Sequence, residues 1–232
     1  MKENRVAYKE EAKRIMNGRY QNVILYLLIT GVITSVISYI GESFNPQVEA
    51  GVVVDPGNPG LAFLFSIILF LIGSAFAYSM ANVFIDVVDG AEIDVVEKVK
   101  IGFVNEYGRN IILTFVMNIF IFLWALLLII PGIIKAYAYS MSFYIANKEP
   151  GLDAMACISK SKEYTKGYKA DLFVLDLSYL GWYILGIFTL GILWLWIVPK
   201  HMSARTLYFN EIYEGSPSFV LPKEEPKDES LF

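Results

Sequence analysis

Residues 61–85 read LAFLFSIILFLIGSAFAYSMANVFI, a run of 25 residues that contains no charged side chain. Uncharged apolar runs of about 18 residues or more are typical of helices that cross a lipid bilayer. Three further uncharged runs occupy residues 23–40, 111–134 and 177–199. A soluble domain of 232 residues could not bury all four runs at once, so the sequence predicts a membrane protein and excludes a soluble enzyme.

The composition supports the same class of protein. Hydrophobic residues make up 56% of the chain and charged residues 18%, against about 45–50% and about 25% in soluble domains. The apolar residues form solid blocks and do not alternate with polar ones, which excludes an outer-membrane barrel. The first block starts only at Val23, after a long charged flank, so we expect a retained helix and not a cleaved signal peptide.

The number of crossings depends on two breaks. A single helix over residues 111–147 would be about 55 Å long, whereas the hydrocarbon core is about 30 Å thick. Pro131-Gly132 lies near the middle of this stretch, and Thr189-Leu190-Gly191 could form a tight turn in the last apolar run. We therefore predict an all-α, polytopic membrane helix bundle over residues 1–213, followed by a disordered tail at 214–232. Its six predicted transmembrane helices are 23–40, 61–85, 111–130, 133–147, 172–187 and 190–210.

Lysine and arginine residues predict the orientation, because they concentrate on the cytoplasmic side of membrane proteins. Of the 19 in the chain, 18 fall in segments that a six-helix threading with both termini inside places in the cytoplasm; Lys135 is the exception. The loop at 41–60 has three acidic residues and no basic one, so it is expected outside. The predicted location is the plasma membrane.

Segments 2–20, 86–110 and 148–170 are predicted to contain cytoplasmic amphipathic helices. The first lies either in the headgroup plane or in solvent beside the membrane. In each segment a glycine that could end the helix, Gly18, Gly108 or Gly167, is closely followed by a basic residue and an apolar hairpin. This order suggests three repeated units, although chance similarity remains an alternative.

Small and polar residues inside the apolar runs are the candidate contact sites. Small residues at four-residue spacing let helices approach closely in lipid; they are Gly73, Ala77, Ala81, Ala138, Ser142 and Ala146. Asn82, Asn118 and Asp176 could form a polar intramembrane site, or the two asparagines could only bond neighbouring helices. Asp176 could equally lie at the cytoplasmic interface.

No constellation of residues predicts catalysis, a cofactor or a metal. The chain has one histidine, His201, and its combination with Asp171 and Asp176 lacks the spacing of a metal site. Cys157 excludes an internal disulfide, and it could be acylated or be a small buried hydrophobe. The basic clusters flank apolar runs, so we expect them to attract anionic lipid headgroups and not nucleic acid.

Several stretches resemble a known family. They are Ala12-Lys13 through Gly18, WALLLIIPGIIK at 124–135, Tyr139-Ser140-Met141, Ser159-Lys160-Ser161 and Lys166-Gly167-Tyr168-Lys169. The chain resembles the bacterial membrane family called domain of unknown function 975, and more distantly the membrane part of glycerophosphodiester phosphodiesterases. The resemblance implies a multi-helix membrane protein without an established activity, and it supplies no catalytic residues.

Two classes of function follow. The first is a non-enzymatic protein that organises or assists a membrane-protein partner through its small-residue faces and basic cytoplasmic segments. The alternative is a carrier or exporter of a small or lipid-like solute, since broken helices and repeats recur in transporters. A polar cavity lined by Asn82, Asn118 or Asp176 would favour transport.

Overall fold

The structure is a computed structural model that describes residues 4–49 and 52–215, and the predicted tail lies outside them from residue 216 on. The described chain is all-α apart from one small antiparallel β-hairpin. Its elements are α1 (Asn4–Met16), α2 (Tyr20–Glu42), β1 (Gln47–Glu49), β2 (Val52–Asp55), α3 (Pro59–Asp89), α4 (Val95–Val104), α5 (Tyr107–Leu127), α6 (Ile129–Tyr139), α7 (Ser142–Lys148), α8 (Ala154–Tyr164), α9 (Lys169–Phe188) and α10 (Trp194–Glu214).

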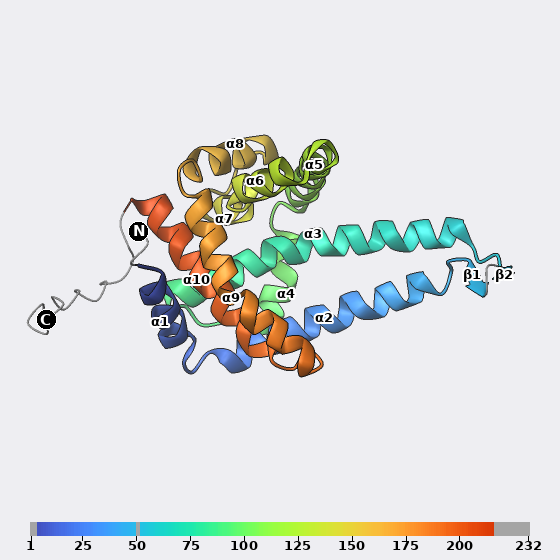
Figure 1. The fold of residues 1–232 in the computed structure, drawn as a ribbon, viewed down its shortest axis with the longest axis horizontal. Helices are drawn as coiled ribbons and strands as arrows, with labels where there is room; N and C mark the ends of the chain where they lie inside the picture. The colour runs from blue at the N-terminus through green and yellow to red at the C-terminus, as the bar shows by residue number, and fades with distance from the viewer. Residues whose placement is uncertain (1–3, 50–51, 216–232) are drawn as a thin grey trace, which may run out of the picture.

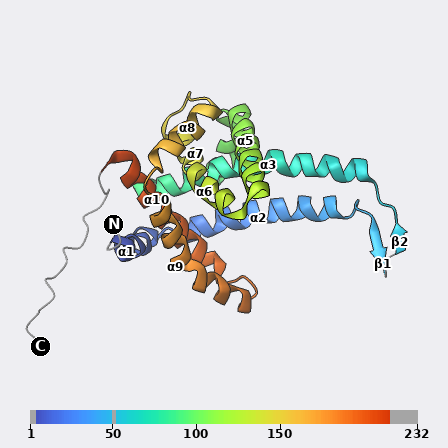
Figure 2. The ribbon, with the colours of Figure 1, turned by 45° about the horizontal axis from the view of Figure 1, so that its top comes forward.

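Three helical hairpins extend from a common base. The hairpins are α2–α3, α5–α6 and α9–α10 (Figures 1 and 2). We call the base the helices α1, α4, α7 and α8 together with the ends of α3 and α10 that contact them. The α2–α3 hairpin carries β1 and β2 at its tip, far from α1 and the end of α10 (Figure 1). Each hairpin therefore leaves the base in its own direction.

The hairpins expose apolar surface on a scale expected for contact with lipid. Phe63 is 67% exposed, Leu126 73% and Phe188 80%, and many large apolar neighbours are similarly open. Helices α2, α3, α5 and α9 are long and apolar enough to cross a membrane. Helix α6 has 11 residues and is only about 16 Å long, so it is shorter than the hydrocarbon core. Four helices thus support the membrane class, whereas the count of six and the orientation stay predictions.

The break in the 111–147 stretch lies three residues before its predicted position. Helix α5 ends at Leu127, and Leu128 is extended with φ −159° and ψ 139°. A proline inside a helix clashes with the carbonyl group four residues earlier, which for Pro131 is that of Leu127. Pro131 therefore lies in the first turn of α6, where its missing N–H costs nothing.

Gly132 acts through its size. Its φ angle is not positive, and a Cβ added there would lie 2.8 Å from the Cα of Ala125. The sequence predicted that this glycine allows the reversal; in the structure it lets α6 pack closely against the end of α5.

The helix predicted over 133–147 is interrupted between Tyr139 and Ser142. Side chains of α8 satisfy the backbone groups freed at this break. The Ser161 hydroxyl donates to the carbonyl of Ala138 at 2.8 Å and accepts from the N–H of Met141 at 3.2 Å. Thr165 donates to the same Ala138 carbonyl at 3.3 Å. A distant segment thus stabilises two short helices where the sequence indicated one.

The predicted amphipathic helices turn their apolar sides to protein. In α1, Tyr8, Ala12 and Met16 are at most 1% exposed, and the Tyr8 ring contacts the Tyr208 ring of α10 edge-on at 5.4 Å. Helix α4 buries Gly102 against α3, and α8 buries Cys157 and Ile158. We predicted that the first helix lies either in the headgroup plane or in solvent. Its docking onto the base was not among these alternatives.

Two of the three proposed units share a further feature. Arg19, next to the start of α2, donates to the carbonyls of Val87 and Gly90 at 3.1 and 2.7 Å, where α3 ends. Arg109, at the start of α5, donates to the carbonyl of Ala146 at 3.0 Å, where α7 ends. Each arginine therefore binds a carbonyl group near the C-terminal end of a helix, α3 or α7, although Gly108 lies inside α5 and ends no helix.

Candidate functional site

A cluster of polar side chains joins α9, α10 and α6. The Nε2 atom of His201 lies 2.7 Å from Oδ1 of Asp176. The Tyr137 hydroxyl donates to the other carboxylate oxygen, Oδ2, at 2.8 Å. The guanidinium of Arg205 lies 3.6 Å from the same oxygen. We call these four residues the Asp176 cluster.

Aromatic side chains enclose the histidine. The Tyr179 ring stacks on the His201 ring with centroids 4.6 Å apart. The Tyr183 hydroxyl lies 2.9 Å from Nδ1 of His201. The Trp194 indole N–H donates to the Tyr183 carbonyl at 3.1 Å and ties the first turn of α10 to α9. Both ring nitrogens of the histidine therefore have hydrogen-bond partners.

The helix geometry explains why these residues meet. Asp176 lies seven residues after the first residue of α9, which is about 10 Å along the helix axis. His201 and Arg205 are four residues apart in α10 and therefore share one helix face. Because α9 and α10 run antiparallel, that face meets Asp176. The side chains of His201, Asp176 and Arg205 are only 10%, 19% and 21% exposed.

The hydrogen bonds of His201 are compatible with more than one arrangement of its ring protons. With a neutral imidazole, Nε2–H donates to Asp176 and Nδ1 accepts from Tyr183; with a protonated imidazole, both nitrogens donate. Arg205 balances the charge of the Asp176 carboxylate when the imidazole is neutral. Within the described residues no group of three or more His, Cys, Asp or Glu side chains could hold a metal ion.

The three predicted polar residues do not form one site. Asn82 accepts a hydrogen bond from the ammonium of Lys98 at 2.7 Å, and Lys98 also pairs with Asp86. Asn118 is exposed on α5. Asp176 belongs to the cluster above. Three pockets are formed by the described residues of other parts of the molecule, and none of these three is lined by Asn82, Asn118 or Asp176. None of them is therefore the polar cavity that would favour transport.

The small residues also occupy different environments. Ala138, Ser142 and Ala146 are at most 2% exposed, with Ala138 near the end of α6 and the other two in α7 of the base. Gly73, Ala77 and Ala81 are half-buried on α3, and a Cβ at Gly73 would meet no atom within 4 Å. Helix α4 approaches α3 closely at Ala75, where Gly102 leaves no room for a Cβ.

Sequence reasoning named His201 with Asp176 only as a combination without the spacing of a metal site, and it missed Arg205, Tyr137 and Tyr183. His201 and Arg205 stand four residues apart within the last predicted span, which is a signal for one polar helix face. Tyr137 and Tyr183 carry no such signal, because tyrosines are frequent throughout the chain, with 15 in total.

Cys157 is fully buried in α8. Burial raises the pKa of its thiol, and a buried thiol with a raised pKa is poorly reactive. Its position therefore matches the small buried hydrophobe that was one of the two expectations, and it offers no surface for acylation in this conformation.

Comparison with known proteins identifies a family and no individual relative. No curated protein and no solved structure matches the chain. The family described as protein of unknown function DUF975 matches over residues 1–138 and 126–216. The similarity to the membrane part of glycerophosphodiester phosphodiesterases stays a resemblance. Because the match extends over most of its length, the chain belongs to the DUF975 family.

Proposed function

We propose that this protein is a non-enzymatic organising or accessory protein of the plasma membrane, whose α5 face binds a helix of another membrane protein. The observation that carries the proposal is the contrast between its intramembrane polar groups. Asn82 and Asp176 are held by internal partners, whereas the described chain supplies no hydrogen bond to the exposed Asn118 side chain.

The surroundings of Asn118 suit a helix partner. Phe115, Ile119 and Phe122 on the same part of α5 are 53%, 38% and 65% exposed. An amide that faces lipid without a partner is unfavourable, and a hydrogen bond to a neighbouring helix contributes about 0.6–2 kcal/mol in a membrane. The amide could therefore orient a partner helix on an otherwise apolar face.

In-cell photo-crosslinking tests this proposal. A benzophenone amino acid replaces Asn118, and a matched variant carries it at Phe63, which is also exposed but lies on α3. We expect a covalent adduct with a second membrane protein from position 118 and none from position 63. Adducts with lipid alone at both positions, or equal protein adducts from both, would contradict the proposal.

A carrier of a small or lipid-like solute is the second candidate. The Asp176 cluster favours it, because titratable side chains within apolar helices often belong to ion or proton pathways. Reconstituted vesicles loaded with a pH-sensitive dye distinguish the two. A carrier moves protons with its solute and loses this activity in Asp176→Asn, whereas an accessory protein shows no flux in either form.

A further inference from the structure

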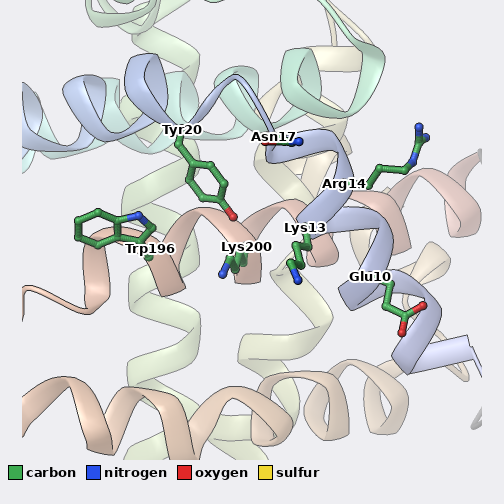
Figure 3. Close-up of a pocket in the computed structure, with 7 residues that line it drawn as sticks. All are labelled: Glu10, Lys13, Arg14, Asn17, Tyr20, Trp196 and Lys200. Atoms are coloured by element: carbon green, nitrogen blue, oxygen red, sulfur yellow. The ribbon is translucent and has the colours of Figure 1, made fainter.

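An open pocket of about 600 Å³ lies where α1, the start of α2 and the first half of α10 meet (Figure 3). Its walls include Lys13, Arg14, Lys200, Glu10, Tyr20 and Trp196. No residue of the Asp176 cluster lines it. The pocket is therefore a separate feature of the molecule.

Two of its cations are available to a ligand. Arg14 is held by Glu11 of its own helix, with Nε 2.7 Å from Oε2. Lys13 and Lys200 form no ion pair within the described chain. They come from helices far apart in the sequence and face one pocket (Figure 3). Glu10 is the acid on its wall, so the pocket keeps an excess of positive charge.

A hydroxyl group in the pocket also lacks a partner. The Tyr20 oxygen is buried, and no described residue forms a hydrogen bond with it. Figure 3 shows this hydroxyl directed toward Lys200, whose ammonium lies 5.9 Å from the centroid of the Tyr20 ring. Leaving a buried donor unpaired is unfavourable. An anion between the two lysines would supply the missing acceptor.

The remaining wall is suited to a lipid. Trp196 precedes Lys200 by four residues on the same face of α10 and is 45% exposed. Tryptophan is enriched at the level of lipid headgroups, with its ring toward the apolar side. A molecule with an anionic head at Lys13 and Lys200 would therefore place its chains along Trp196 and the apolar tip of the α9–α10 hairpin.

We propose that this pocket binds the phosphate group of an anionic phospholipid. Lys13 and Lys200 hold the phosphate, Tyr20 donates a hydrogen bond to it, and Trp196 contacts the acyl chains. The inference goes beyond the proposed function and rests on it only for placing the protein in a lipid membrane. Binding of a partner helix at Asn118 would survive failure of this lipid site, and the reverse also holds.

Native mass spectrometry of the full chain in a neutral detergent tests the site. The probes are short-chain phosphatidylglycerol, phosphatidylcholine of equal chain length, and inorganic phosphate as a competitor. The double variant Lys13→Gln/Lys200→Gln is compared with Lys100→Gln/Lys166→Gln, which removes two exposed lysines elsewhere. Circular dichroism establishes that both variants are folded.

We expect one saturable phosphatidylglycerol per chain, with affinity at least about tenfold weaker in Lys13→Gln/Lys200→Gln, since two charge-assisted contacts are lost. The matched variant should change affinity by less than about twofold, because exposed charges contribute little. Glu10→Gln should bind more tightly. Equal loss in both double variants, equal binding of phosphatidylcholine, or displacement by inorganic phosphate at the lipid's own concentration would overturn the proposal.

Discussion

Gly102 of α4 lies directly against the carbonyl group of Ala75 of α3, with no room for a side chain between them. A methyl group at position 102 would overlap the Ala75 backbone. This contact holds α4 close to α3, so that the Lys98 ammonium reaches Asn82 at 2.7 Å.

Gly102→Ala is expected to destabilise the protein. Forcing a methyl group into a packed contact costs about 1–3 kcal/mol, which lowers the unfolding midpoint by about 2–12 °C in a protein of this size. Thermal unfolding in detergent measures the effect. Gly73→Ala is the matched control, because a Cβ there meets open space, and it should be neutral or slightly stabilising. Equal midpoints for the two variants would contradict the packing argument.

Asp176 and His201 are expected to act as a unit. Asp176→Asn leaves Arg205 without its counter-charge and should cost about 2–3 kcal/mol, less than a fully buried pair because the side chains are partly exposed. His201→Gln should cost less, since glutamine can still donate to the carboxylate. Unfolding of the two single variants and the double variant measures the coupling, which we expect to reach about 1 kcal/mol. Strictly additive effects would show that the two residues act independently.

Arg109 should be irreplaceable by lysine. Its guanidinium reaches the carbonyls of Ala146 at 3.0 Å and Leu152 at 3.3 Å, and one ammonium lacks the fork that binds both. Arg109→Lys is expected to lose about 1–2 kcal/mol of stability. Arg14→Lys, at an exposed side chain, provides the comparison and should change stability little. A stable Arg109→Lys protein would remove the capping role.

The threading can be tested with single cysteines, since Cys157 is buried and the pKa of its thiol is raised by burial. Intact cells are treated with a maleimide that does not cross membranes. We expect Val54→Cys, at the tip of the α2–α3 hairpin, to be labelled. Lys166→Cys should react only after the cells are permeabilised. The parent chain, whose one cysteine is Cys157, should not be labelled in intact or in permeabilised cells. Labelling of Lys166→Cys in intact cells would reverse the predicted orientation.

Glu211 should oppose folding at neutral pH. Burial raises the pKa of its carboxyl above the ordinary 4.5, and Oε2 has no hydrogen bond within the described chain. Because the folded state binds the proton more tightly, the group favours folding at low pH, and this contribution is lost as the pH rises through the raised pKa. Glu211→Gln should therefore raise the unfolding midpoint at pH 7, with a smaller gain near pH 4. Glu163→Gln, at an exposed position, should show no such pH dependence.

Much of the architecture could be predicted from local pattern. Uncharged runs as long as residues 61–85 have few stable conformations other than a helix in lipid, so the membrane class and the long helices follow from composition and length. The break near Pro131 was also predictable, because the lost N–H is a property of the residue itself. Its position at Leu128 follows from the clash four residues upstream.

Hydropathy and proline geometry are local properties, so the order of residues was enough to predict which stretches avoid water and that the 111–147 stretch must bend. Which polar groups meet depends instead on how the helices pack. Asp176 and His201 are 25 residues apart in the chain, and Ser161 reaches the break at Ala138 from a different helix. Such contacts depend on the directions in which the hairpins leave the base. The free energy of that packing is the sum of many small contributions, so no single residue or local pattern predicts it.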